Sequence, residues 1–172
     1  MTHKMAKKRL FKKYDSEKIW WLRFVKDLLA FAVILVLVFT LVLGVSRVNG
    51  SSMSPTLKNG QAVLYYRLDK NYNRGDIISL WLPNGDYYVK RVIAVEGDTV
   101  DIRDGVVYIN GSAETGTYIN GKTEPAASGI SYPLTVKAGK VFVLGDNREN
   151  SVDSRNYGEF ALSQTRGKII FY

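Results

Sequence analysis

Hydrophobic and polar positions divide the chain into three parts. Residues 1–26 are polar and basic, the following segment is uniformly apolar, and from Gln61 onward short apolar runs alternate with turn residues. The apolar segment, Leu28–Ser46, contains nineteen residues without a charge. As an α-helix it would be about 28 Å long, close to the roughly 30 Å hydrocarbon core of a bilayer. The pattern therefore predicts one transmembrane helix within residues 27–47.

Two other structures compete for an apolar run of this kind. A buried core helix is one, but a chain of 172 residues rarely encloses a helix that is apolar on every face. A cleavable secretory signal is the other, because a basic segment precedes the run. The run is longer than an ordinary signal-peptide core and no small-x-small cleavage site follows it. An uncleaved membrane anchor therefore fits better.

The third part of the chain has the character of a β domain. Asn-Gly and Asp-Gly dipeptides, which favour tight turns, separate its apolar runs, and no amphipathic pattern of ten or more residues predicts a helix. Residues 110–135, rich in Gly, Thr, Ser and Asn, are expected to form an insertion or a long excursion. We predict a mainly β fold, with the helix followed by an antiparallel all-β extracytoplasmic domain over residues 48–172. The expected strands are Ala62–Tyr66, Ile77–Leu82, Tyr87–Val95, Thr99–Arg103, Val106–Ile109, Lys140–Leu144 and Lys168–Tyr172.

The distribution of charge agrees with this organisation. The chain has 24 Lys and Arg against 16 Asp and Glu, a net charge of +8. Residues 1–26 hold a balance of +7, so the rest of the chain is nearly neutral and has no basic bias toward nucleic acid. The positive-inside rule places residues 1–26 in the cytoplasm and the β domain outside the cytoplasmic membrane. The basic tail is expected to contact anionic membrane lipid and to have no partner of its own.

Composition also limits the chemistry. The chain has no cysteine, which excludes thiol proteases, disulfides and thiolate metal sites. Its single histidine, His3, lies in the predicted cytoplasmic tail, which excludes a Ser-His-Asp triad on the outer face. A nucleophilic serine in the β domain would need lysine, a carboxylate or no base at all. No metal or cofactor is implied.

One serine occupies a notable position after the apolar run. Ser52 lies in Gly50-Ser51-Ser52-Met53-Ser54-Pro55-Thr56, six residues beyond Ser46, so even an extended link keeps it within about 20 Å of the end of the span. Signal-peptide cleavage sites likewise follow directly after an apolar segment. The position therefore suits a membrane-inserted substrate.

A second candidate is a lysine on a predicted strand. Alternation puts Tyr88, Lys90 and Val92 on one face of the strand. Burial among apolar neighbours lowers an amine pKa, and moving it from about 10.4 to near 7–8 requires about 4 kcal/mol from the fold. The alternative is that Lys90 or Arg91 extends from a strand edge to water, and this pattern taken by itself favours the alternative.

Four short boxes together resemble a known family. They are Ser52-Met53-Ser54-Pro55-Thr56, Arg74-Gly75-Asp76, Tyr88-x-Lys90-Arg91-Val92 with Gly97-Asp98, and Gly145-Asp146-Asn147-Arg148-x-x-Ser151-x-Asp153-Ser154-Arg155. In this order, after an N-terminal anchor, they are similar to the boxes of bacterial type I signal peptidases. These are membrane-anchored serine proteases that remove signal peptides from exported proteins. The single anchor, small size and absence of cysteine favour the Gram-positive type.

The resemblance implies a Ser-Lys dyad. Ser52 would attack the scissile bond, and Lys90 would deprotonate it and later return the proton to the leaving amine. Ser151 would orient the lysine by a hydrogen bond, and the Ser52 N–H would help to form the oxyanion hole, where one donor is typically worth about 3–4 kcal/mol. Gly50 departs from those members that have a serine there as a second oxyanion donor.

The resemblance also implies a supporting scaffold and pockets for the small side chains of an Ala-x-Ala sequence. The expected salt-bridged scaffold consists of Arg91, Asp146, Asp153 and Arg155. The expected pocket residues are Val48, Met53, Leu57, Tyr88 and Val89.

Two further interpretations remain to be weighed. Residues 116–123 satisfy the P-loop pattern G-x-x-x-x-G-K-[ST], but a polar segment precedes them and Pro125 follows where a helix should start, so we expect no nucleotide partner. The alternative function is a non-proteolytic or dedicated-substrate factor for the assembly of pili or other surface proteins. A degenerate, non-proteolytic member would be expected to lack Ser52 or Lys90, and both are present.

Overall fold

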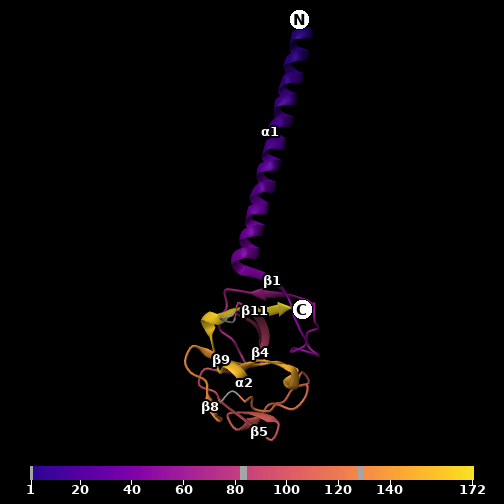
Figure 1. Ribbon diagram of the computed structural model, residues 1–172. Coiled ribbons are helices and arrows are strands. Elements are labelled where there is room, and N and C mark those ends of the chain that lie inside the picture. The colour runs from indigo at the N-terminus through magenta and orange to yellow at the C-terminus, as the bar shows by residue number, and fades with distance from the viewer. Residues whose placement is uncertain (1, 82–84, 128–129) are drawn as a thin grey trace. The chain divides into compact units, whose positions relative to one another are not determined.

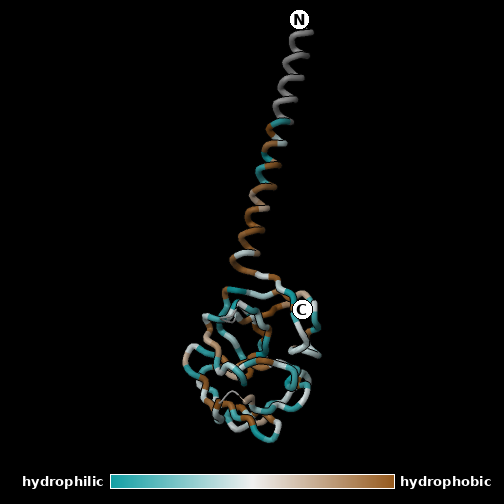
Figure 2. The backbone as a smooth tube through the Cα atoms, in the orientation of Figure 1, coloured by the Kyte–Doolittle hydropathy of each residue, from teal (hydrophilic) through white to brown (hydrophobic). Residues whose placement is uncertain are grey.

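The computed structural model describes residues 2–81, 85–127 and 130–172, with side chains from Lys18 onward. It consists of two compact units, Met1–Thr40 and Leu41–Tyr172. Helix α1 covers Thr2–Leu37 and ends in a π-helical turn, Val38–Val42. Among the described residues, Lys18–Val42 is the one helical stretch long and apolar enough to cross a membrane; it has a mean hydropathy of 2.5 and is not buried. Figure 2 shows the hydrophobic colouring of this stretch. An exposed apolar helix is what a bilayer would cover.

The end of this helix differs from the expectation. The predicted span reached residue 47, whereas the helical conformation stops at Val42 and Leu43–Arg47 form strand β1, antiparallel to β2 (Ala62–Tyr66). Gly44 lies opposite Tyr65, and a Cβ at position 44 would overlap the Tyr65 ring. The glycine therefore lets the aromatic ring pack against the strand. An uninterrupted apolar run gives no signal of this change because periodicity does not separate a buried strand from an apolar helix.

The second unit contains two antiparallel sheets (Figure 1). The larger has seven strands in the order β1-β2-β11-β3-β4-β9-β10, and the smaller has four in the order β7-β6-β5-β8. The remaining strands are β3 (Ile77–Trp81), β4 (Tyr87–Val95), β5 (Thr99–Arg103), β6 (Val106–Ile109), β7 (Ser112–Ala113), β8 (Leu134–Thr135), β9 (Lys140–Leu144), β10 (Phe160–Ala161) and β11 (Thr165–Phe171). The short helices are Arg148–Asn150, α2 (Ser154–Tyr157) and Leu162–Gln164.

The predicted mainly β, antiparallel fold is confirmed. Five strands, β2, β4, β5, β6 and β9, have the expected bounds. Strand β3 ends at Trp81, and the predicted Leu82 lies outside the described residues. Strand β11 begins at Thr165, three residues before the expected start. The two-residue strands β7, β8 and β10 were not predicted because they are too short to show alternation.

Among the described residues, three buried clusters form the core of the β unit. Alternate residues of β3, β4 and β9 build the first cluster on one face of the large sheet, around Ile78, Leu80, Val92 and Val143. The second joins the opposite side of β4 and β9 to the small sheet through residues such as Phe142, Leu144, Val100 and Val107. The third packs the turn after β1 against β2 and β11, and it contains Met53, Leu57, Val63, Tyr65 and Ile169.

The excursion between β7 and β8 contains the P-loop-like residues 116–123. Within the described stretch 112–127 these residues form turns, coil and a single β-bridge at Asn120, with no strand leading directly into them and no helix after them. The segment therefore lacks the strand, loop and helix that hold a phosphate in a P-loop protein.

Candidate active site

Ser52 lies in the turn that connects β1 to β2. The turn is anchored from below by Met53 and Leu57, which are 1% and 0% exposed. The Leu57 N–H donates to the Met53 carbonyl at 2.8 Å, and the Asn147 N–H donates to the Ser52 carbonyl at 2.9 Å. Ser52 itself is half-buried, so its hydroxyl is held at the surface by a fixed backbone.

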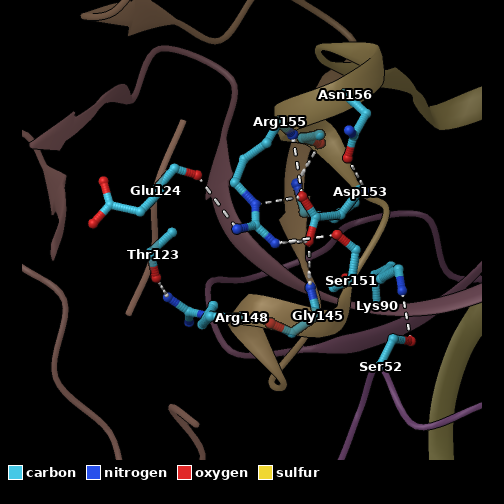
Figure 3. A network of polar contacts seen from close by, with 12 residues as sticks. Ser52, Lys90, Thr123, Glu124, Gly145, Arg148, Ser151, Asp153, Arg155 and Asn156 are labelled. Atoms are coloured by element: carbon cyan, nitrogen blue, oxygen red, sulfur yellow. Dashed lines mark hydrogen bonds and ion pairs between the residues drawn. The ribbon is translucent and has the colours of Figure 1, made fainter. Parts of the chain in front are cut away.

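Lys90 reaches Ser52 from the middle of the large sheet. It lies on β4 opposite Ile78, it is 3% exposed, and its Nζ is hydrogen-bonded to Ser52 Oγ at 2.6 Å (Figure 3). The pKa of Lys90 is lowered from 10.5 to about 8, mainly by burial; the Arg155 charge also lowers it, and the Asp153 and Asp146 carboxylates oppose the change. A lysine in this state is neutral in a useful fraction of molecules near neutral pH and can accept the Ser52 proton.

Two buried ion pairs flank the dyad. Arg91, the residue after Lys90, donates from Nε and Nη2 to the two oxygens of Asp146 at 2.8 and 2.7 Å. Arg155 donates in the same forked manner to Asp153, with both distances 2.9 Å, and Asp153 also accepts from the Gly145 N–H at 3.0 Å. The four residues that sequence similarity assigned to a scaffold are therefore brought together as two bidentate pairs.

Ser151 lies beside Lys90 in Figure 3, but the expected hydrogen bond between them is not formed. Its Oγ is buried and has no hydrogen-bond partner in the described part of the chain. A Cβ on Gly145 would overlap Ser151 Oγ and crowd the Ser52 carbonyl. Glycine at position 145 therefore allows the third box to pack directly against the nucleophile turn, and the orienting role of Ser151 stays a prediction.

A cleft of about 290 Å³ opens in front of the dyad. Its walls come from residues 46–52, from Tyr87–Lys90 at the start of β4, and from residues 150–152. Val48, Tyr88 and Val89 line it as expected. Met53 and Leu57 do not: both point into the core under the Ser52 turn, because that turn needs apolar anchors to hold its backbone on the sheet.

The backbone N–H of the nucleophile is available as an oxyanion donor. In the described ranges no residue accepts a hydrogen bond from the Ser52 N–H. The Gly50 N–H is already donated to Asn59 Oδ1 at 2.9 Å, and Gly50 has no side chain. Gly50 thus shapes the turn and lines the cleft without offering a second donor.

A third buried ion pair was not foreseen from the sequence. Arg148 and Glu114, whose side chains are 1% and 4% exposed, form two hydrogen bonds at 2.6 and 2.7 Å. Arg148 also donates to Thr123 Oγ1 at 2.9 Å and to the Gly145 carbonyl at 3.0 Å (Figure 3). Glu114 lies in the excursion, 34 residues away, and no local pattern links the two positions.

The Arg74-Gly75-Asp76 box supports β4, the strand that carries Lys90 and Arg91. The Gly75 carbonyl accepts from Arg91 Nη1 at 2.8 Å, and its N–H donates to the Val92 carbonyl at 2.8 Å. Arg74 pairs with Asp98, and Asp76 with Lys168.

Across the described residues, no group of three or more His, Cys, Asp or Glu side chains is placed to hold a metal ion.

Comparison with known proteins gives consistent matches. The model of the family described as "Signal peptidase, peptidase S26" matches residues 21–172. Signal peptidase I S of Bacillus subtilis strain 168 is 36% identical, over 91% of this chain and 92% of its own length. Signal peptidase I of Bacillus licheniformis is 39% identical over 63% of this chain, which spans 64% of that relative. A crystal structure of a signal peptidase I from Enterococcus faecalis V583 is 32% identical, covers 57% of this chain and 96% of its own, and has a TM-score of 0.49. The family match contains all four boxes.

Proposed function

The chain belongs to the signal peptidase family, peptidase S26, whose members are serine peptidases that remove signal peptides, and we propose that it performs this cleavage with Ser52 as nucleophile and Lys90 as general base. The observation that carries the proposal is the 2.6 Å contact between Lys90 Nζ and Ser52 Oγ, made by a lysine that is 3% exposed. The assembly-factor alternative has no support among the matched relatives.

In the proposed reaction, neutral Lys90 takes the Ser52 proton as Oγ attacks the scissile carbonyl carbon. The carbonyl electrons move to the oxygen, which the Ser52 N–H stabilises as an oxyanion. The C–N bond then breaks, and the Lys90 ammonium returns its proton to the departing amine. Water, deprotonated by Lys90, then attacks the acyl ester; the ester C–O bond breaks, and the Lys90 ammonium gives its proton to Ser52 Oγ.

The scaffold has a defined part in this scheme. Lys90 can act as a base only while its amine is buried and points at Ser52. The Arg91–Asp146 and Arg155–Asp153 pairs place charged groups near this amine without exposing it to water. We infer that Ser151 Oγ, buried and unpartnered in the described residues, turns toward Lys90 when the lysine becomes charged during turnover. Val48, Tyr88 and Val89 would contact the small side chains of the substrate.

The membrane arrangement completes the proposal. The family is membrane-anchored, and Lys18–Val42 has the length and hydropathy of an anchor. We infer an inside N-terminus from the +7 balance of residues 1–26, with residues 48–172 on the outer face, where exported precursors present their signal peptides. Nothing in this scheme calls for nucleic acid, nucleotide, metal or cofactor.

The test is cleavage of an exported preprotein by the purified full chain in detergent or vesicles, with N-terminal sequencing of the product. We expect cleavage after a small-x-small site, and we expect Ser52→Ala and Lys90→Met each to abolish it. Ser54→Ala, a change in the same turn outside the dyad, is the matched control and should retain activity. Processing that persists in Ser52→Ala or Lys90→Met would overturn the assigned roles.

A further inference from the structure

The excursion after β7 folds back onto the third box. The Asn120 N–H donates to the Asp146 carbonyl at 2.9 Å, and the Asn120 carbonyl accepts from the Arg148 N–H at 2.8 Å. Asn120 and Asn147 thereby form a parallel bridge. These contacts hold a segment far away in sequence against Asp146, the carboxylate that pairs with Arg91.

A closed circuit of contacts links the excursion to the site. Arg148 is bound to Glu114 on one side and to the Gly145 carbonyl on the other. Glu114 Oε1 also accepts from Tyr118 Oη at 3.1 Å. The Tyr118 ring lies under the Arg91 guanidinium, with the Arg91 Cζ 3.9 Å from the ring centroid. The circuit of contacts therefore runs from Arg91 through Asp146 and its neighbour Gly145 to Arg148, Glu114, Tyr118 and back to Arg91.

Tyr118 contacts the face of the Arg91 guanidinium, whose edge is occupied by Asp146. Stacking of a guanidinium on an aromatic face is favourable and fixes the plane of the fork. Burial and the nearby Glu114 carboxylate raise the pKa of Tyr118 to about 12. Tyr118 therefore keeps its proton over the working pH range and continues to donate to Glu114.

We propose that Tyr118 is a positioning residue for the dyad, because its ring holds the Arg91 guanidinium in bidentate contact with Asp146 beside Lys90 and Ser52. The proposal deepens the Ser-Lys function and rests on it. It also assigns a role to residues 114–123: they clamp the third box and the strand that carries the base.

The consequence for Lys90 follows from the charges around it. The groups that face Lys90 are the Asp153 and Asp146 carboxylates, the Arg155 guanidinium, Ser52 Oγ and the Tyr88 ring, whose centroid is 5.1 Å from Nζ. Asp146 favours the charged lysine, and Arg91 neutralises Asp146. If Arg91 loses its support and moves, the Asp146 charge is less compensated and the pKa of Lys90 rises. Less neutral base is then present at pH 7.

The test compares pH profiles of kcat/KM for a signal-peptide substrate, measured with the full chain in detergent. We expect Tyr118→Leu to lower kcat/KM at pH 7 by roughly tenfold and to move the midpoint of the rising limb upward by about 0.5–1 pH unit, so that much of the rate returns at high pH. Tyr118→Phe keeps the ring and should stay within about twofold of the parent chain. Tyr108→Leu removes a comparable stacking partner from Arg103 in the small sheet, and it should change neither value.

The outcomes separate this proposal from the function on which it rests. A Tyr118→Leu chain with reduced rate but the parent midpoint would show a structural defect only and would overturn the positioning role, as would an unchanged chain. Tyr118→Met, which also lacks a ring but has a more adaptable side chain, gives the same comparison if the leucine variant does not fold. Activity that persists in Lys90→Met would instead defeat the Ser-Lys assignment, because the profile would no longer report Lys90.

Discussion

Lys90 shows how one residue connects the fold to the chemistry. A free lysine side chain is charged at pH 7 and a poor base, whereas Lys90 is buried between sheet and turn with its Nζ against Ser52. The fold bears the cost of keeping this amine out of water, and in return a fraction of molecules holds a neutral base at neutral pH. This exchange gives two measurable consequences, one in activity and one in stability.

The first prediction concerns the pH dependence of cleavage. Burial lowers the pKa of Lys90 to about 8, and only the neutral amine accepts the Ser52 proton. We therefore expect kcat/KM to rise between about pH 7 and pH 9 with a midpoint near 8, measured on a soluble signal-peptide substrate. A midpoint near 10.5 would mean that the lysine is solvated, and a flat profile would mean that another group is the base.

The second prediction concerns the free energy of unfolding of Lys90→Met. The folded pKa of about 8 lies below the unfolded value of 10.5, so the folded state binds this proton more weakly. The buried amine therefore lowers the free energy of unfolding; this loss is fully present below pH 8, shrinks as pH rises from 8 to 10.5, and is absent above 10.5. Removing the amine should therefore stabilise the inactive chain by up to about 3 kcal/mol at pH 7 and by nothing near pH 11. Denaturant unfolding at the two pH values measures the difference, and a gain at pH 7 equal to that at pH 11 would argue against the buried charge.

Some residues of the site could be identified from the sequence and others could not, for a physical reason. Ser52, Lys90 and the four scaffold residues belong to boxes with fixed local spacing, and the structure brings them together as three contacting pairs. Glu114, Tyr118 and their partners are joined only by tertiary packing, so no spacing rule finds them. Met53 lies within the nucleophile box and Leu57 directly follows it, yet both point into the core, because a box gives proximity along the chain and not side-chain direction.

At the scale of elements, the turn from β4 to β5 shows how a box residue serves the fold. Asp98 accepts from the Val95 N–H at 2.9 Å, from Asn110 Nδ2 at 3.0 Å and from Arg74 Nε at 2.8 Å. The hydrogen bond from Arg74 is the main cause that lowers the pKa of Asp98 to about 2. The turn thereby connects β4 to the small sheet and to the Arg74 box.

The third prediction follows from that carboxylate. A folded pKa below the unfolded 3.8 means that the stabilisation is present above pH 3.8 and is lost as pH falls through 2. Because Arg74 is 45% exposed, solvent screening reduces the effect, and we expect Asp98→Asn to cost about 1–2 kcal/mol at pH 7 and nearly nothing at pH 2. Asp101→Asn, which breaks an exposed 3.5 Å pair with Arg103, is the control and should cost little at either pH. Equal losses for the two variants would contradict the prediction.

Elements were predicted well where the pattern repeats and poorly where it does not. Strands such as β4 and β9 carry apolar runs bounded by turn residues, which identify them locally. Strand β1 was hidden at the end of a longer apolar run, and its conformation is set by pairing with β2 and by the fit of Gly44 to Tyr65. Such pairing is decided by a partner about twenty residues away, so the local sequence does not report it.

At the scale of the whole molecule, the boundary between anchor and catalytic unit decides which truncation should work. The β unit begins at Leu41, and β1 covers the edge of β2 while Ser46 and Arg47 form part of the cleft wall. A chain that lacks residues 1–40 keeps these features, and a chain that lacks residues 1–47 loses them. A helix that ran to residue 47 would make the two truncations equivalent.

We therefore expect the two truncated chains to behave differently. The chain without residues 1–40 should cleave a soluble signal-peptide substrate near the full rate, but should process a vesicle-inserted precursor at least about tenfold more slowly, because the anchor no longer raises the local concentration of enzyme at the membrane. The chain without residues 1–47 should also lose most peptide cleavage, since β2 is left as an open edge and the cleft lacks one wall. Equal peptide cleavage by both chains would show that β1 is dispensable to the site. Equal processing of the vesicle-inserted precursor by the full chain and the chain without residues 1–40 would show that the anchor does not position the enzyme. The β unit itself would then have to bring Ser52 to the membrane surface.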